Sequence, residues 1–212
     1  MLDVSCFTVG AFQVNTYLIK DRATGACAII DTGESDELVQ RLQALQPTPD
    51  IQMILLTHGH LDHAGALVVL QQEFDVPTYL PRLEQPLFET LPQQGDWFGA
   101  SEMNRPCGRI DKLLDDGDTI KLGETELHFI STPGHTPGQG CYYDEYEIFV
   151  GDTLFAGSIG RTDLPMGDPP LMEASLRRLM ALPAQLQVHS GHGPVTTLGK
   201  ELADNPFLQF LR

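Results

Sequence analysis

Apolar and β-branched residues gather in short runs through the first third of the chain. The runs at 14–20 and 26–33 are separated by turn-forming residues, which predicts two strands joined as a hairpin. Over 35–47, apolar positions recur at helical spacing until two prolines end the pattern. A continuous apolar run at 51–56 predicts a buried strand, and the run at 67–74 predicts a helix.

The pattern weakens in the middle of the chain and then returns. Prolines, glycines and mixed polar residues between 77 and 109 predict loops with short helices around 83–90. Four runs with strand character follow and predict a second sheet: 119–122, 125–130, 140–143 and 147–150. A helix at 171–180 and a strand at 186–189 complete an order of strands, helix and strand that occurs twice. This repeated order predicts an α/β fold.

Length and composition narrow the class of protein. A chain of 212 residues, 42% of them hydrophobic, is long enough to bury a core, and we expect one domain over residues 1–212. No apolar stretch reaches about 18 residues and no signal peptide is evident, so we expect a cytoplasmic protein without membrane contact. The net charge of −16, with no basic run, argues against a nucleic-acid partner. The four cysteines are scattered, which predicts reduced thiols.

Residues 54–65, ILLTHGHLDHAG, hold three of the seven histidines of the chain together with an aspartate. His58 and His60 are two apart around a glycine, so in an extended chain both imidazoles leave the same face. Asp62 and His63 lie where the chain turns into the predicted helix, so their side chains can face a second metal position next to the first. The spacing therefore predicts metal ligands at two adjacent positions.

A loop of six residues cannot surround a metal ion, so further ligands must come from other segments. His135, Asp152 and His192 each follow a predicted strand and each neighbour a glycine. Because loops at the carboxyl ends of strands converge in α/β sheets, we expect these three side chains in the same site. His128 alternates with apolar residues, which favours a sheet-surface position, and His189 is not expected to be a ligand.

The predicted ligands are nitrogen and oxygen atoms without thiolate, a set that suits zinc, iron or manganese. We expect one or two divalent transition-metal ions, with zinc ahead of iron and manganese. Such ions lower the pKa of bound water to about 7 and stabilise an oxyanion, and their positive charge attracts a small anionic substrate. A metal-stabilised binding module is disfavoured, because structural zinc sites are closed and four-coordinate.

The motifs THGHLDH, TPGHTPG, GDTLF and GHGP occur in this order, and together they resemble the metallo-β-lactamase superfamily. The resemblance implies an αββα sandwich of two mixed β-sheets flanked by helices. The ligand set that it implies is His58, His60 and His135 on one metal and Asp62, His63 and His192 on the other, with Asp152 bridging the two.

The chain has an aspartate at position 152, and in this it resembles the glyoxalase II branch of the superfamily. Enzymes of that branch hydrolyse S-2-hydroxyacylglutathione thioesters. The ending LGKELADNPFLQ, residues 198–209, resembles the short single-domain members. Arg161 and Asp163 match a lysine and a tyrosine of the two-domain members. The resemblance implies a thioester hydrolase in which a metal-bound hydroxide attacks the carbonyl, Asp62 orients this hydroxide and Arg161 binds an anionic part of the substrate.

A second function is also compatible with these residues. GRTD, residues 160–163, is similar to persulfide dioxygenases of the same superfamily. There a single iron is held by the counterparts of His58, His135 and Asp152, a two-histidine, one-carboxylate arrangement that suits oxygen chemistry. The alternative function is therefore oxidation of glutathione persulfide by a mononuclear iron enzyme. Both groups typically carry all seven ligands, so the ligand set does not decide between them.

Overall fold

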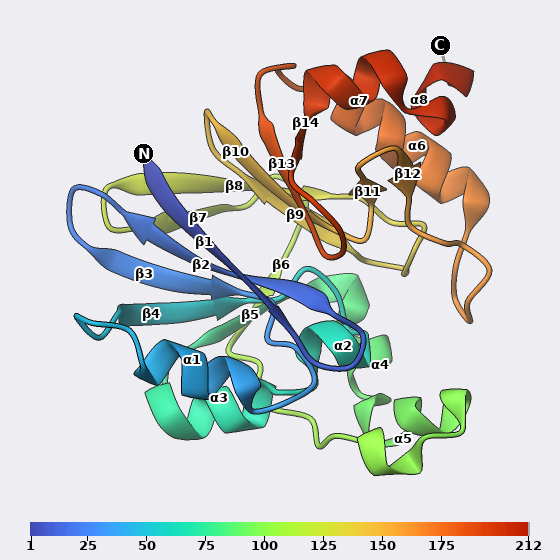
Figure 1. The fold of residues 1–212 in the computed structure, drawn as a ribbon. Coiled ribbons are helices and arrows are strands. Elements are labelled where there is room, and N and C mark those ends of the chain that lie inside the picture. Colours follow the sequence, from blue (N-terminus) through green and yellow to red (C-terminus); the bar gives the residue numbers. More distant parts are fainter. Residues whose placement is uncertain (212) are drawn as a thin grey trace.

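Two six-stranded sheets lie face to face in the computed structural model, which describes residues 1–211 (Figure 1). The first sheet follows chain order and consists of β1 (Leu2–Val9), β2 (Val14–Asp21), β3 (Ala26–Ile30), β4 (Asp50–Leu55), β5 (Thr78–Pro81) and β6 (Lys112–Leu114). The second, in the order β14-β13-β10-β9-β8-β7, consists of β7 (Thr119–Leu122), β8 (Thr125–Ser131), β9 (Gly140–Tyr143), β10 (Glu147–Gly151), β13 (Gln187–Ser190) and β14 (Thr196–Thr197). A short hairpin of β11 (Leu154–Phe155) and β12 (Ser158–Ile159) stands apart from both sheets.

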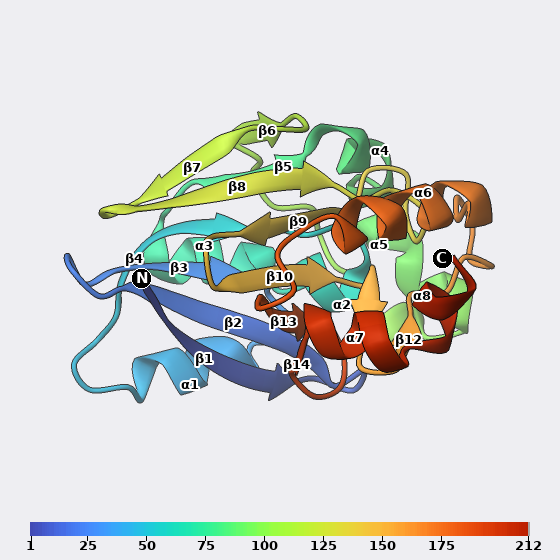
Figure 2. The ribbon, with the colours of Figure 1, turned by 90° about the horizontal axis from the view of Figure 1, so that it is seen from above.

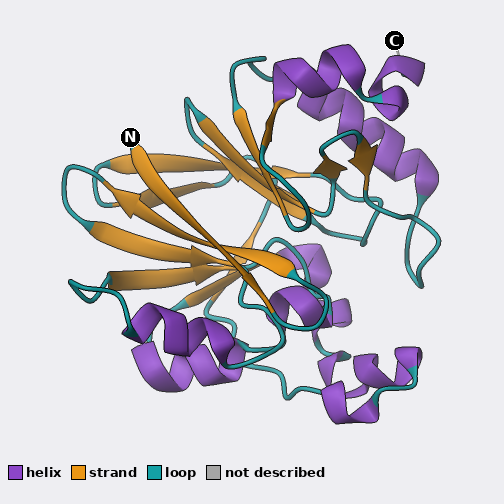
Figure 3. Cartoon of the chain, viewed as in Figure 1, coloured by secondary structure: helices purple, strands orange, loops and turns teal. Residues whose placement is uncertain are grey.

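Helices cover the outer faces of both sheets (Figure 3). The first sheet is covered by α1 (Glu37–Gln43) and α3 (Leu67–Phe74), and the second by α6 (Pro169–Met180), α7 (Leu198–Asp204) and α8 (Pro206–Phe210). Shorter helical turns are α2 (Leu61–Ala64), η1 (Arg82–Glu84), α4 (Gln85–Phe88), α5 (Leu91–Gln94), η2 (Gly95–Phe98) and η3 (Ser101–Met103). The layers confirm the expected αββα sandwich of two mixed sheets. Within residues 1–211, no helix is long and apolar enough to cross a membrane.

Neighbouring residues of the central strands pack into different layers. In β3, Ile29 belongs to the apolar cluster under α1 and α3, whereas Ile30 belongs to the cluster between the sheets. In β10, Ile148 packs on the side of α6, and Phe149 packs between the sheets. Strands buried on both faces lack polar alternation, which explains why they appear in the sequence as continuous apolar runs.

The sequence pattern located most of these elements. The hairpin predicted at 14–20 and 26–33 is the antiparallel pair β2–β3, and the four predicted strands of the second sheet are all present. The interval 77–109 holds the expected short helices but also β5, which the prediction of loops missed. The pattern also gave no signal for β1, β6, β14, α7 and α8. β1 is an edge strand with several exposed residues, and β5, β6 and β14 are too short to establish a period.

Strand directions bring four loops to one end of the sandwich. β10 and β13 run parallel, and β8 points the same way because both β8 and β10 are antiparallel to β9. In the other sheet, β3 and β4 are parallel neighbours. The loops that follow β4, β8, β10 and β13 contain the predicted ligands, and Figure 2 shows β8, β10 and β13 in the second sheet, with β9 between β8 and β10.

Candidate metal centre

The histidine-rich motif spans the turn from a buried strand into a one-turn helix. β4 ends at Leu55 and α2 begins at Leu61, with His60 as its N-cap residue in extended conformation (φ −71°, ψ 152°). The extended segment carries His58 and His60, and the helical turn carries the next two ligands. His58 and His63 are fully buried. The change from extended to helical backbone therefore lets these four neighbouring residues face two adjacent metal positions.

Three imidazoles form the first cluster of ligand atoms. Nε2 of His58 lies 3.1 Å from Nδ1 of His60, and that atom lies 3.0 Å from Nε2 of His135. His135 follows β8 of the second sheet, so the cluster joins the two sheets. The structure thus brings together the three residues predicted for one metal, which we call the first triad.

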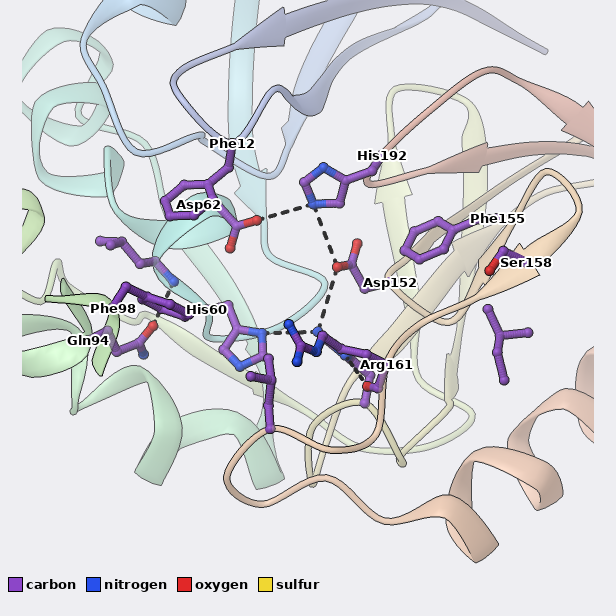
Figure 4. A pocket seen from close by; sticks show the side chains of 14 residues that line it. Phe12, His60, Asp62, Gln94, Phe98, Asp152, Phe155, Ser158, Arg161 and His192 are labelled. Carbon is purple, nitrogen blue, oxygen red and sulfur yellow. Dashed lines mark hydrogen bonds and ion pairs between the residues drawn. The ribbon is translucent and has the colours of Figure 1, made fainter. Parts of the chain in front are cut away.

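Two carboxylates and two imidazoles form the second cluster, and Figure 4 shows Asp62, Asp152 and His192 of this group. Oδ2 of Asp62 lies 3.1 Å from Nε2 of His192 and 3.6 Å from Nε2 of His63, and these three residues are the second triad. Asp152 stands between the triads: Oδ2 is 3.6 Å from Nε2 of both His135 and His192, and Oδ1 is 3.4 Å from Nε2 of His63. This placement is the one expected for a bridging carboxylate.

The ligand atoms fit divalent transition-metal ions. Nε2 of His63 and Oδ1 of Asp152 are buried and have no hydrogen-bond partner among residues 1–211. Such unsatisfied atoms cost free energy, and a cation bound to them removes this cost. Gly191 keeps the space open, because a Cβ there would lie 2.3 Å from Oδ1 of Asp152 and 2.5 Å from Cε1 of His63. Imidazole and carboxylate donors suit zinc, iron and manganese alike.

Burial and mutual proximity keep the imidazoles of His58 and His60 in the first triad neutral. Burial, followed by the proximity of His135, lowers the pKa of His60 to about 3. Burial, together with the surrounding imidazoles, holds the pKa of His58 well below its usual value. A neutral imidazole offers its lone pair to a cation without first releasing a proton, so this triad is prepared to bind metal.

In the second triad, nearby carboxylates favour the protonated, positively charged form of the imidazoles, in contrast to the first triad. Burial alone would lower the pKa of His63, but Asp62, Asp152 and Asp31 outweigh it and hold this pKa well above its usual value. Burial also opposes the positive charge of His192, whose pKa is raised by Asp62 and Asp152. Burial would raise the pKa of both ligand carboxylates, but the nearby imidazoles lower it. Both carboxylates therefore favour the ionised form, which is the form that binds a cation.

Comparison with known proteins identifies the family. A model described as the metallo-beta-lactamase superfamily matches residues 9–192, which contain all seven predicted ligands. The chain belongs to the metallo-β-lactamase superfamily. The hydroxyacylglutathione hydrolase GloC of Haemophilus influenzae is 38% identical over 217 residues, which cover 98% of each chain.

Solved structures of this superfamily are similar over nearly the whole chain. TTHA1623 in a di-iron-bound form has a TM-score of 0.85 and 38% identity, covering 97% of this chain and 100% of that chain. The BLEG-1 B3 metallo-beta-lactamase has a TM-score of 0.88 and 35% identity, covering 97% of this chain and 99% of that chain. Because these relatives carry different descriptions, superfamily membership establishes the fold and the metal-binding character of the family rather than a reaction or a substrate.

Asp31 contacts side chains that position predicted ligands of both triads, and it was not among the predicted site residues. One of its oxygens, Oδ2, lies 2.8 Å from Nδ1 of His63 and accepts a hydrogen bond from the Thr57 hydroxyl at 2.8 Å. That hydroxyl lies 3.1 Å from Nδ1 of His58. Partners of this kind fix the orientation of a ligand ring. Asp31 follows β3 and precedes a Thr-Gly pair, so the signal used for Asp152, an acidic residue at a strand end near a glycine, was also present here.

Two buried side chains hold the histidine-rich loop from outside it, and these were also missed. Glu84 accepts hydrogen bonds from Gly59 N at 2.8 Å and from Gly138 N at 2.6 Å, so it ties the loop to the segment after His135. Gln94 accepts from Leu61 N at 2.7 Å and donates to the Gly59 carbonyl at 2.9 Å. Both come from the region with the weakest sequence pattern, where no local signal marks them.

The metal centre opens into a cavity of about 380 Å³ (Figure 4). Apolar side chains line much of it: Phe12, Leu61, Phe98, Phe155, Ile159 and Leu164. Arg161 is the basic residue of the lining, and its Nε and Nη2 donate to the two oxygens of Asp163 at 2.8 Å each. The predicted substrate-binding residue thus lies in the cavity wall, in an exposed ion pair with its neighbour.

The remaining histidines lie outside the cluster. His128 is half-exposed on the sheet surface in β8, as predicted, with its ring 5.2 Å from that of Tyr143. His189 stacks on Phe149 with ring centroids 4.8 Å apart, and its Nε2 lies 2.7 Å from Oε2 of Glu147. The four cysteines are free thiols, which agrees with the prediction.

Proposed function

We propose that this protein is a metal-dependent hydrolase of S-2-hydroxyacylglutathione or of a related anionic thioester. The observation that carries the proposal is the carboxylate of Asp152, which stands between two ligand triads beside an open cavity. The 38% identity to a hydroxyacylglutathione hydrolase over 98% of both chains supports this substrate class.

The expected reaction is attack of water on the thioester carbonyl. Divalent metal ions, when bound, lower the pKa of a coordinated water and polarise a carbonyl group. His58, His60 and His135 would hold one ion, and Asp62, His63 and His192 the other, with Asp152 shared. Asp62 also lines the cavity, so its carboxylate is placed to orient the attacking water and accept its proton.

The cavity wall supplies two further requirements of the reaction, which are the exclusion of water and the binding of an anionic substrate. Its apolar residues exclude bulk water, which strengthens electrostatic interactions inside the site. Arg161 has five N–H donors, and Asp163 occupies one on Nε and one on Nη2. The Nη1 donors would therefore be available to an anionic part of the substrate without displacement of Asp163.

Persulfide oxidation by a single iron is the second candidate function. Oδ2 of Asp152 lies 3.6 Å from Nε2 of His135, and His58 shares a cluster with Asp152 in which all ligand atoms lie within 4.8 Å of one another. These three residues would form the two-histidine, one-carboxylate set that this chemistry needs. The similar TTHA1623 structure, described as di-iron-bound, keeps iron among the metals to be tested.

Parallel assays on one metal-analysed preparation test the proposal. Protein purified without chelator is expected to contain about one to two transition-metal ions per chain and to hydrolyse S-lactoylglutathione. It is expected to consume no oxygen with glutathione persulfide. Full thioesterase activity in metal-free protein would contradict the mechanism, and oxygen uptake without hydrolysis would favour the second candidate.

His192→Ala separates a two-metal site from a one-metal site. His192 belongs only to the second triad, so its loss should lower kcat for the thioester by about 100-fold or more while the first triad keeps its ion. A one-iron dioxygenase would keep most of its activity in this variant and lose it in His135→Ala. Circular dichroism and melting curves establish that both variants fold. Near-full thioesterase activity of folded His192→Ala would exclude two-metal hydrolysis.

A further inference from the structure

The β11–β12 hairpin forms one wall of the cavity without belonging to either sheet. Phe155 at the end of β11 and Ser158 and Ile159 in β12 all line the cavity, and the first two are labelled in Figure 4. Each strand has only two residues. A hairpin of this size has little stability of its own. Contacts from elsewhere must therefore hold this wall in place.

A buried carboxylate of α7 supplies one set of contacts. Glu201 is 1% exposed, and its Oε2 accepts a hydrogen bond from the backbone N–H of Gly157, in the hairpin turn, at 2.8 Å. Its Oε1 accepts from the hydroxyl of Thr196 at 2.6 Å. Thr196 begins β14, which follows the loop of His192. One side chain therefore connects the cavity wall with the segment beyond a ligand of the second triad.

A buried amide at the start of α8 supplies the second set. Nδ2 of Asn205 lies 3.0 Å from the carbonyl oxygen of Ser158, 3.4 Å from that of Phe155 and 3.0 Å from Oε2 of Glu201. Its Oδ1 accepts from Phe207 N at 3.0 Å and so caps α8. Asn205 is fully buried. It touches both strands of the hairpin and joins them to the carboxylate that holds the turn.

The hairpin also leads directly to a ligand of the first triad. The chain leaves β12 at Ile159 and reaches Arg161, whose carbonyl oxygen lies 2.8 Å from Nδ1 of His135. A carbonyl in this position fixes which nitrogen of the imidazole faces the metal centre. The position of the hairpin therefore determines the cavity wall and the place of Arg161 in it, whereas the ring of His135 is also held by its contact with His60 in the first triad.

We propose that Glu201 and Asn205 are positioning residues for substrate binding: from the C-terminal helices they hold the β11–β12 wall against the cavity. The inference rests on the proposed function for its kinetic consequence. It also gives a physical role to LGKELADNPFLQ, the ending that resembles short single-domain hydrolases. In that segment Glu201 and Asn205 are the buried polar residues whose side chains reach the active-site end of the fold.

Two substitutions test the proposal by kinetics with S-lactoylglutathione. Glu201→Gln removes the charge that accepts from Gly157, and Asn205→Ser removes the donors to the hairpin while keeping a side chain that caps α8. Each should raise KM by about fivefold or more and change kcat by less than about twofold, because the wall binds substrate but does no chemistry. Metal content should equal that of the wild type. A purely structural role would instead lower the melting temperature and the active fraction and leave KM unchanged.

Asp204→Asn is the matched control. Asp204 lies in the same helix, next to Asn205, but its carboxylate is exposed and pairs with Lys200 at 3.0 Å. This variant should keep the wild-type KM. Unchanged KM in folded Glu201→Gln and Asn205→Ser, in a preparation whose wild type hydrolyses the thioester, would overturn the inference while leaving the proposed function intact.

Hydrogen exchange provides a readout that is independent of activity. The Gly157 amide lies in a turn and donates to Glu201, so in the wild type it should exchange at least about tenfold more slowly than an unprotected amide. Glu201→Gln should lower this protection severalfold, because a neutral amide oxygen is a weaker acceptor than a carboxylate, and Asp204→Asn should not. An unprotected Gly157 amide in the wild type would overturn the inference even if the variants failed to fold or the protein proved not to be a thioesterase.

Discussion

Asp21 and Asp31 are two buried aspartates at opposite ends of the same antiparallel strand pair. Asp21 ends β2 and is 1% exposed, and Asp31 follows β3 and is 2% exposed. Both are surrounded by hydrogen-bond donors. Asp21 accepts from the backbone and hydroxyl of Thr24 and from the Thr125 hydroxyl, whereas Asp31 accepts from the backbone and hydroxyl of Thr57 and contacts the imidazole of His63.

The difference lies in what their partners do. The partners of Asp21 are turn and strand residues that join the two sheets at the end remote from the metal centre. A partner of Asp31 is itself a predicted ligand, and another contacts His58. Equal burial and similar bonding thus produce a structural anchor at one end and a ligand-orienting group at the other. We conclude that the role of a buried carboxylate depends on its partners.

Among substitutions outside the predicted ligands, Asp31→Asn should have the largest effect. It tests the role of the buried aspartate near the metal centre. Asparagine fits the left-handed backbone of this position (φ 58°) and retains the shape of the side chain. It loses the negative charge facing His63, so metal affinity and kcat/KM should each fall by about 10- to 100-fold. Competition with a metal chelator and thioester kinetics measure the two quantities. Wild-type affinity and activity in this variant would assign Asp31 the same purely structural role as Asp21.

Asp21→Asn should show the opposite pattern. The substitution removes the negative charge that strengthens the hydrogen bonds from Thr24 and Thr125, and it replaces one of the two acceptor oxygens by an NH2 group, so these buried contacts are weakened. The free energy of unfolding of the metal-free protein should fall by about 2 kcal/mol, as measured by urea denaturation. The kcat of the folded, metal-loaded variant should equal that of the wild type. A loss of kcat would mean that the remote end is coupled to the site.

The comparison also shows what the sequence could and could not predict. His58, His60, Asp62 and His63 form a short motif, and a histidine or aspartate at a strand end marks the other three predicted ligands, so the gathering of these side chains was predictable. Glu84 acts on a loop some 25 positions away, and its bonds are to backbone N–H groups, which every sequence has. Such contacts depend on tertiary packing alone, and for that reason no local pattern reveals them.

Arg161→Ala should have a smaller effect. It extends the comparison from the two buried carboxylates to an exposed charged residue. Arg161 is exposed and already paired with Asp163, so its loss leaves no buried group without a partner. Its effect should therefore appear in substrate binding: KM for S-lactoylglutathione should rise about tenfold, with the free energy of unfolding unchanged. Arg161→Lys should recover part of the loss. An unchanged KM would make the ion pair a surface feature and weaken the glutathione part of the proposal.

The smallest expected effect is the pH dependence of the Asp21 contribution. Hydrogen bonds from Thr125 and Thr24 outweigh burial and lower the pKa of Asp21 in the folded protein. Its folded pKa is therefore below the unfolded value of about 3.9, so the contribution to stability is fully present above that value and is lost as the pH falls through the folded pKa.

The difference in unfolding free energy between the metal-free wild type and Asp21→Asn should be constant from about pH 7 to pH 5 and should decrease below about pH 4. Taking the difference cancels the titration of the ligand carboxylates, which both proteins share. Urea denaturation at each pH measures it. A difference that grew toward low pH would mean that Asp21 is held protonated in the folded state, and its contacts with Thr24 and Thr125 would then not be those of a structural anchor in its ionised form.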